Sequence, residues 1–358
     1  MPDSIPDVLK AFAAGQIVVV TDDEDREGEG DLIVAASLCT TEKMAFIIRH
    51  TSGIVCAPIT TDDARRLRLD PMVAYNDSNH TTAFTVSIDY KPGMTTGISA
   101  EERVACCRAL ANPNVGASDF ARPGHIFPLI ARDGGVLLRS GHTEAAVDLC
   151  KMANLPPVGI ISELMNDDGT VMKGEQVAAF AKKHGLKHVT IADMIAYRQA
   201  REKLIERVST FTVDTPIGPM QGYAYRSPFD PVYHVAFVYK GVGDGRNVLT
   251  RFHKPNIIKD VFFGYSRVLA ALEYFRKNGS GVLVYLRDGA AGVPVAPLEN
   301  DRSAEADRNR QWREVGVGAQ ILRDLGVTSI RHLTSSVHDY KGLSGFGIEI
   351  VGNEPFEG

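Results

Sequence analysis

The chain has 358 residues, of which 44% are hydrophobic and 23% charged, as is typical of a globular protein long enough for two domains. Its formal net charge of -5 gives no reason to expect nucleic acid or an anionic membrane surface as a partner. No apolar stretch has the length that a membrane-spanning helix needs, and the N-terminus lacks the basic and apolar regions of a signal peptide. We therefore expect a cytoplasmic protein without membrane or nucleic-acid partners.

The first two hundred residues alternate between helix-like and strand-like patterns, which predicts an α/β or α+β domain. Ser99 to Glu102 has the pattern of a capping box at a helix start. Helices are predicted over residues 4–14, 42–50, 99–111, 142–153 and 174–184. Strands are predicted over residues 17–20, 54–59, 83–88, 136–139 and 158–161.

A charged amphipathic helix is predicted over residues 192–208, and a hairpin-rich pattern follows it. We place the domain boundary there, with one domain over residues 1–205 and a second over 206–358. In the second domain, strands are predicted over 211–213, 220–225, 233–239 and 282–286, and helices over 261–277 and 304–325.

The five cysteines form no C-x-x-C pair, and their odd number argues against a disulfide framework. We expect reduced and mostly buried thiols at Cys39, Cys56, Cys106, Cys107 and Cys150. No cysteine follows Cys150, so a cysteine-based zinc site is excluded from the C-terminal half.

Residues 22–31 hold seven carboxylates, two glycines and Arg26 directly after the strand predicted over 17–20. Like charges repel one another, so a solvated acidic loop is one interpretation of this run. A strand that leads into an oxygen-rich loop also suits a site for Mg²⁺ or Mn²⁺, which is the other interpretation.

Residues 139–144 lie where a helix is predicted to begin, near His142. The free backbone N–H groups of a helix start, the Arg139 guanidinium and the Thr143 hydroxyl would together suit a phosphate-sized anion. Alternatively, Ser140 or Thr143 only caps the helix. His142 could be a surface histidine or could ligate a metal ion held by Glu27.

Other polar residues interrupt apolar surroundings, and each alone is typical of a structural role. Thr95 lies in a loop with glycines at both ends, and His125 follows a Pro-Gly pair. Glu163 ends an apolar strand, and Cys56 lies inside one.

Taken together, these segments resemble 3,4-dihydroxy-2-butanone 4-phosphate synthase of riboflavin biosynthesis, in the family's order and over about residues 5–202. The likeness is carried by residues 22–31, 51–56, 95–97, 122–129, 139–144 and 163–169. One departure is Thr81, which stands where the family usually has glycine, in a loop that covers the substrate.

The resemblance implies a lyase that converts D-ribulose 5-phosphate into L-3,4-dihydroxy-2-butanone 4-phosphate and formate, with two Mg²⁺ or Mn²⁺ ions per site, in a homodimer. It implies metal ligands at Glu27 and His142 and catalytic roles for His125, Glu163 and Cys56. The substrate-binding residues that it implies are Arg26, Glu27, Asp31, Thr95, Arg139, Ser140, Gly141, His142, Thr143 and Glu163.

From about residue 210 the chain resembles GTP cyclohydrolase II, in residues 215–218, 249–253, 282–287, 315–326 and 345–351. The resemblance implies a retained α/β fold, but Asn256 stands at the first zinc cysteine, and residues 287–292 and Val315 depart from two further motifs. We therefore expect no zinc and no GTP hydrolysis. His253, His332 and His338 are more simply surface or core residues than a replacement metal site. The alternatives are a bifunctional enzyme that also hydrolyses GTP and a non-catalytic nucleotide-binding or regulatory protein.

Overall fold

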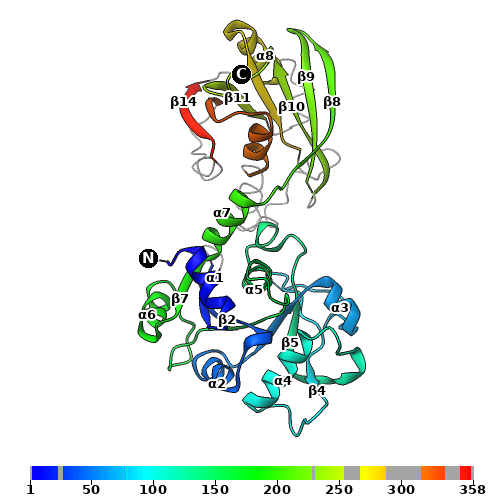
Figure 1. Ribbon diagram of the computed structural model, residues 1–358, viewed down its shortest axis with the longest axis vertical. Helices are drawn as coiled ribbons and strands as arrows, with labels where there is room; N and C mark the ends of the chain where they lie inside the picture. The colour runs from blue at the N-terminus through cyan, green and yellow to red at the C-terminus, as the bar shows by residue number, and fades with distance from the viewer. Residues whose placement is uncertain are drawn as a thin grey trace. The chain divides into compact units, whose positions relative to one another are not determined.

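The computed structural model describes residues 2–22, 27–78, 80–227, 230–253, 267–287, 316–334 and 347–355. The chain divides into two compact units, Met1–Tyr197 and Arg198–Gly358 (Figure 1). The sequence placed the boundary near residue 205, a few residues further along the chain. Among the described helices, none combines the length and the apolar character needed to cross a membrane.

The described part of the first unit contains a seven-stranded mixed sheet in the order β4-β5-β3-β6-β2-β1-β7. Strand β1 pairs in parallel with β7, as β3 does with β5, and the other neighbours are antiparallel. The strands are β1 Val18–Thr21, β2 Gly30–Ala35, β3 Cys56–Ile59, β4 Ile88–Tyr90, β5 Phe120–Ile130, β6 Gly159–Glu163 and β7 Lys187–Thr190.

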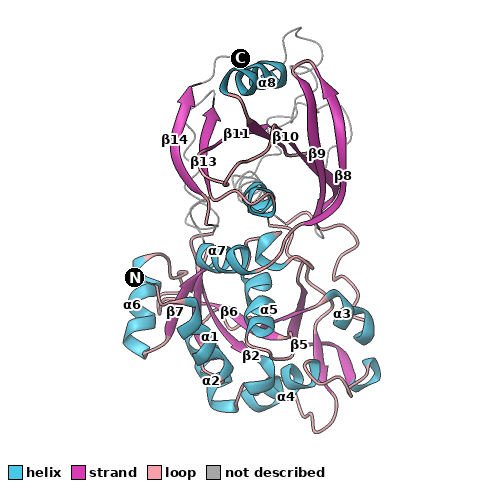
Figure 2. Ribbon diagram, turned by 45° about the horizontal axis from the view of Figure 1, so that its top comes forward, coloured by secondary structure: helices cyan, strands magenta, loops and turns pink. Residues whose placement is uncertain are grey.

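Helices flank this sheet (Figure 2). Helix α5 packs against β2, β3 and β6 and against α1, whereas α2, α4 and α6 contribute to one apolar cluster that includes alternate residues of β1 and β2. The helices are α1 Ile5–Ala13, α2 Thr41–His50, α3 Thr61–Leu67, α4 Ala100–Leu110, α5 His142–Met152, α6 Glu175–His184 and α7 Ile191–Arg201.

The second unit also has a seven-stranded mixed sheet in its described residues, in the order β14-β13-β11-β12-β10-β9-β8. Helix α8 (Arg267–Asn278) and the helical residues 316–324 contribute to two different apolar clusters with strand β12. Because neighbouring residues of a strand face opposite ways, the two helices cover opposite faces of the sheet. The strands are β8 Glu206–Thr215, β9 Gly218–Ser227, β10 Asp230–Tyr239, β11 Val248–His253, β12 Gly281–Tyr285, β13 Ser329–Thr334 and β14 Glu349–Pro355.

The predicted α/β class is confirmed, and so is the capping box of α4, in which Ser99 and Glu102 each accept the backbone N–H of the other. Helices predicted over 4–14, 42–50, 142–153 and 174–184 are present. All five cysteines are free and buried, as expected. Burial raises the pKa of each thiol, to about 11 at Cys39 and about 12 at Cys150.

The strand predicted over 136–139 is wrong. Residues Gly135–Leu137 form a 3₁₀ turn, because Gly135 has a φ of +61° and the Val136 N–H donates to the Asp148 carboxylate at 2.9 Å. The strand predicted over 83–88 is largely wrong too, since Phe84 and Thr85 form only isolated bridges and β4 begins at Ile88.

The helix predicted over 192–208 ends at Arg201, and β8 begins at Glu206. Of the helix predicted over 261–277, residues 267–277 are helical and 261–266 lie outside the described residues. Of the helix predicted over 304–325, residues 316–324 are helical and 304–315 lie outside. The sequence patterns did not predict helix α3 or strands β2, β5, β7, β11, β13 and β14.

Gly159 sets the distance between β6 and α5. A Cβ at this position would lie 2.8 Å from the Cβ of Ala146 on α5, which is closer than such atoms approach. We expect Gly159→Ala to lower the free energy of unfolding by about 1–3 kcal/mol, because the helix must move off the sheet. Urea titration measures this. Gly116→Ala is the control, because its Cβ would have no neighbour nearer than 3.8 Å; equal losses in both variants would contradict the packing argument.

Candidate active site

A cluster of possible metal ligands lies where β1, the acidic loop and α5 meet. Asp22 follows β1, Glu27 lies in the loop, and His142 is the first residue of α5. Each offers one ligand atom, and the three atoms lie within 4.8 Å of one another. The structure thus brings together Glu27 and His142, as predicted from the sequence. It adds Asp22, which no pattern singled out within a run of seven carboxylates.

Asp31 on β2 lies beside this cluster and is 2% exposed. Its Oδ1 is buried without a hydrogen-bond partner among the described residues and lies 3.7 Å from Nδ1 of His142. Burial raises the pKa of Asp31 well above its usual value, and the negative charges of Glu163, Glu27, Asp22 and Glu29 raise it further. A buried carboxylate with an unsatisfied oxygen among other carboxylates fits a site for a divalent cation, and these oxygen and imidazole donors suit Mg²⁺ or Mn²⁺.

Backbone contacts fix the ends of the acidic loop. The Glu29 N–H donates to Oδ1 of Asp22 at 2.9 Å, and the Lys173 ammonium donates to the Glu27 carbonyl at 2.6 Å. The same ammonium lies 3.6 Å from the Glu29 carboxylate. Residues 23–26 lie outside the described residues, so the predicted substrate contact of Arg26 has no structural description.

The N-terminus of α5 forms the second part of the site. Gly141 is its N-cap, and no side chain caps the helix, so neither Ser140 nor Thr143 acts as the cap that the sequence left open. Both side chains are nevertheless buried. A Cβ on Gly141 would lie 2.3 Å from Nη1 of Arg139, so only glycine lets the guanidinium approach the helix start. Guanidinium and helix dipole thus place positive charge next to His142, one of the possible metal ligands.

Arg139 also contacts a loop that lies far away in sequence. Its Nη1 donates to Glu144 at 2.7 Å, and its Nη2 donates to the His80 carbonyl at 3.2 Å and to Oγ1 of Thr82 at 2.9 Å. The imidazole Nε2 of His80 lies 3.5 Å from Oε1 of Glu27. Residues 80–82 therefore contact both Arg139 at the N-terminus of α5 and Glu27 of the carboxylate cluster.

Glu163 ends β6 directly opposite Asp31 on β2. Its Oε2 accepts the Ser52 hydroxyl at 2.7 Å. Cys56 lies on the neighbouring strand β3, is 3% exposed, and pairs with Ile161 of β6. Burial, together with the charges of Glu163 and Asp31, raises the pKa of Cys56 well above its usual value, so the thiol is neutral near pH 7.

Two residues predicted for the site, His125 and Thr95, form hydrogen bonds with carboxylates outside the metal-ligand cluster. His125 lies on β5, which β3 separates from β6, and its Nδ1 and backbone N–H bond to the two carboxylate oxygens of Asp89 at 2.7 and 2.9 Å. The Thr95 hydroxyl donates to Glu102 at 2.9 Å. Hydrogen bonds from Thr95 and Ser99 lower the pKa of Glu102 to about 2. The carboxylate partners Asp89 and Glu102 were not predicted; for Glu102 the capping box was the only signal.

In the second unit, His253 ends β11 and His332 lies on the adjacent β13, and both are buried. The His253 ring stacks on Tyr285 at 5.3 Å between centroids, so both histidines are core residues. Among the described residues, the only group of three or more possible metal ligands is the one in the first unit. Asn256, residues 288–292, Val315 and His338 lie outside the described residues.

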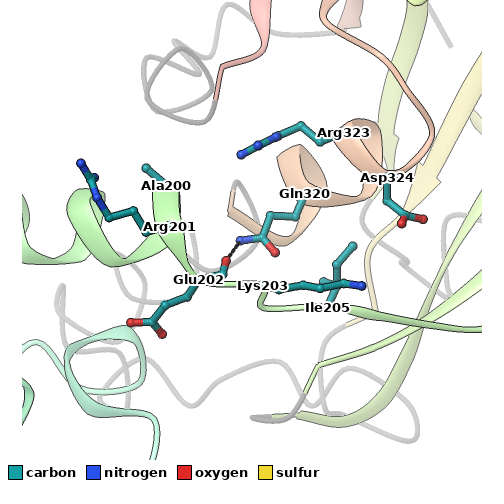
Figure 3. A pocket seen from close by; sticks show the side chains of 8 residues that line it. All are labelled: Ala200, Arg201, Glu202, Lys203, Ile205, Gln320, Arg323 and Asp324. Atoms are coloured by element: carbon teal, nitrogen blue, oxygen red, sulfur yellow. Dashed lines mark hydrogen bonds between the residues drawn. The ribbon is translucent and has the colours of Figure 1, made fainter. Parts of the chain in front are cut away.

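A pocket in the second unit contains Gln320, which belongs to residues 315–326 that resemble GTP cyclohydrolase II. Its lining residues are Ala200, Arg201, Glu202, Lys203, Ile205, Gln320, Arg323 and Asp324 (Figure 3). Oε1 of Gln320 accepts the Leu204 N–H at 2.6 Å, and Nε2 donates to the carbonyls of Gln199 and Glu202 at 3.2 and 2.7 Å. The side-chain amide of Gln320 thus binds backbone N–H and carbonyl groups at the C-terminal end of α7, where the chain turns toward β8. This explains why the helix ends before residue 208.

Comparison with known proteins agrees with this organisation. Residues 6–197 match the family described as 3,4-dihydroxy-2-butanone 4-phosphate synthase, and residues 206–355 match GTP cyclohydrolase II. A solved two-domain 3,4-dihydroxy-2-butanone 4-phosphate synthase from A. baumannii, RibBX, is 35% identical over 97% of this chain and 99% of its own, with a TM-score of 0.82.

Two further relatives each carry part of the comparison. A 3,4-dihydroxy-2-butanone 4-phosphate synthase solved with two magnesium ions is 48% identical over 56% of this chain and 98% of its own, with a TM-score of 0.55. The bifunctional riboflavin biosynthesis protein RIBA 1 of Arabidopsis thaliana is 43% identical over 98% of this chain and 68% of its own length.

The chain belongs to the 3,4-dihydroxy-2-butanone 4-phosphate synthase family, with a GTP cyclohydrolase II domain behind the synthase domain. Its enzymatic activity is that of this synthase, in riboflavin biosynthesis.

His332 makes the stability of the second unit depend on pH. Burial and the charge of Arg251 lower its pKa to about 4. The imidazole takes up a proton near pH 6.5 in the unfolded chain but only near pH 4 in the folded one. The contribution of neutral His332 to the free energy of unfolding is therefore complete above pH 6.5 and is lost as the pH falls toward 4. We expect a loss of up to about 3 kcal/mol, measured by urea titration at pH 7 and pH 4.5. His332→Phe should remove this part of the pH dependence; an unchanged profile in the variant would contradict the assignment.

Proposed function

We propose that D-ribulose 5-phosphate binds with its hydroxyls at the Asp22–Glu27–His142 cluster and its phosphate at the N-terminus of α5. The observation that carries this proposal is that the cluster of carboxylates lies next to the positively charged N-terminus of α5. His142 belongs to the carboxylate cluster, and Thr143, Gly141 and Arg139 surround the positive helix start next to it. A sugar phosphate offers both the hydroxyls that a divalent cation binds and the dianion that a helix start binds.

The residues that would hold the cation are Asp22, Glu27 and His142, with Asp31 at their side. We propose two Mg²⁺ or Mn²⁺ ions per site and no zinc, which the relative solved with two magnesium ions supports. When bound, such ions supply positive charge that stabilises negative charge developing on the substrate oxygens. The raised pKa of Asp31 supports this proposal, since a cation would remove the cost of burying that carboxylate among others.

We assign proton transfer to Glu163 and, on the family resemblance, to His125, whose described contacts are with Asp89. Glu163 faces Asp31 across the β2–β6 pair, next to the cluster. Because Asp89 holds Nδ1 of His125, its Nε2 is the nitrogen that can take up or release a proton. Cys56, as a neutral buried thiol beside Glu163, would shape the site and would not act as a nucleophile. Ser140 and Thr95 complete the proposed set of substrate contacts.

We further propose a homodimer, as the family resemblance implies. Exposed apolar side chains support this proposal, because large hydrophobic residues are costly to leave in water. Ile54 is 52% exposed and Ile98 49%, and they lie in the segments that carry Cys56 and Thr95.

For the second unit we propose that no GTP is hydrolysed. The zinc of a cyclohydrolase of this type would need soft thiolate ligands, and the sequence has no cysteine after Cys150. The two-domain synthase from A. baumannii, described by its synthase activity, supports this proposal.

Formate release tests both units at once, because both reactions liberate formate. Full-length protein receives ribulose 5-phosphate or GTP in separate tubes that contain Mg²⁺. We expect formate from ribulose 5-phosphate alone, its loss on chelation with EDTA, and its return when Mg²⁺ is added in excess. Formate from GTP would refute the proposal for the second unit, and the absence of formate in both tubes would refute the proposal for the first.

Glu163→Gln and His125→Ala test the proton-transfer assignment. We expect each variant to lose at least about 10²-fold in formate release, as is usual when a positioned acid or base is removed, with an unchanged circular dichroism spectrum. Glu175→Gln on the exposed first turn of α6 is the control and should retain full activity. Turnover at the unmodified rate in either active-site variant would contradict its role.

A further inference from the structure

The segment His80–Thr82, here called the strap, contacts Arg139 and Glu27, two side chains that the proposed substrate and cation sites use. Arg139 donates to the His80 carbonyl and to the Thr82 hydroxyl, and the His80 imidazole lies 3.5 Å from the Glu27 carboxylate. The strap therefore lies across both the phosphate-binding and the cation-binding parts of the proposed site.

The donors of Arg139 show that strap and phosphate compete. Nη2 has two N–H groups, and the two strap acceptors, at 3.2 and 2.9 Å, use both. Nη1 bonds to Glu144, which is 1% exposed and also accepts the Arg132 N–H at 3.0 Å, so the guanidinium cannot swing away from the strap without leaving a buried carboxylate. A phosphate oxygen can reach Nη2 only after the strap has left it.

The backbone of the strap opposes this contact. Thr81 has a φ of +48°, in the left-handed region that β-branched residues rarely adopt. Its N–H donates to the Ser78 carbonyl at 3.0 Å, and the Asn76 amide donates to the Thr82 carbonyl at 2.9 Å, so hydrogen bonds within the loop offset part of this strain. Glycine would adopt this φ without the penalty.

We propose that Thr81 and Thr82 set the affinity of the enzyme for its sugar phosphate, by fixing how firmly the strap holds Arg139 when no substrate is bound. The Thr82 hydroxyl strengthens the hold, and the strained backbone of Thr81 weakens it. Both are positioning residues that act through Arg139, and the inference rests on the proposed role of Arg139 in phosphate binding.

Two substitutions should shift affinity in opposite directions. Thr82→Val keeps the shape and removes the acceptor, so the KM for ribulose 5-phosphate should fall about fivefold, the effect of one ordinary intramolecular hydrogen bond. Thr81→Gly removes the backbone penalty, so the strap holds more firmly and KM should rise about fivefold, after allowance for the greater freedom of glycine in the released strap. In both variants kcat should stay within about twofold, since neither residue takes part in proton transfer or cation binding.

Binding of inorganic phosphate provides a readout that does not depend on catalysis. Isothermal titration of metal-free, full-length protein should give a lower Kd for Thr82→Val and a higher Kd for Thr81→Gly. The matched control is Arg68→Gly, because Arg68 has a φ of +50° at the C-terminal end of α3, whereas the hydrogen bonds described for Arg139 go to Glu144, His80 and Thr82. It relieves a similar backbone penalty and should leave KM and the phosphate Kd unchanged.

Shifts of both variants in the same direction, or an equal shift in the Arg68→Gly control, would overturn the strap proposal. Arg139→Ala separates this failure from failure of the proposed function. If Arg139→Ala abolishes phosphate binding while the threonine variants do not diverge, Arg139 binds phosphate and the strap has no part in it. If Arg139→Ala leaves phosphate binding intact, the proposed phosphate site is itself wrong, and the strap proposal fails with it.

Discussion

The main physical constraint on the first unit is that it buries negative charge. Asp31 is 2% exposed, and the nearby charges of Glu163, Glu27, Asp22 and Glu29 all raise its pKa. Such a cluster opposes folding unless positive charge is brought to it. The fold supplies part of that charge through the start of α5 and through Lys173, which binds the Glu27 carbonyl. The negative charge that these groups do not balance makes the site suitable for divalent cations.

Much of this arrangement could be predicted from the sequence, and the failures have physical causes. The acidic loop and the start of α5 follow from short-range patterns, because each has a local signature, whereas the family resemblance singled out Glu27 and His142 as metal ligands. Strand β5 was missed because Pro123 and Gly124 interrupt it, although its backbone pairs with β3 and β4. The helix end at Arg201 was missed because the bonds that stop the helix come from Gln320, more than a hundred residues later in the chain.

The described fold of the second unit does not depend on cysteine. Its sheet, its two covering helices and the Gln320 amide need no cysteine, so they persist in a chain that has none after Cys150. A motif shared with an enzyme family can therefore mark a structural contact. Gln320 satisfies the end of α7 in this way, and His253 and His332 belong to the core.

The thiols of the chain have a practical consequence. All five are buried, and burial raises the pKa of each, so the reactive thiolate form is scarce near pH 7. Mild oxidants and alkylating reagents consequently meet little native sulfur to attack. A single cysteine introduced at an exposed position would be far more nucleophilic than the natural ones. Spectroscopic probes could then be attached at one chosen place, with every native thiol left in the sequence.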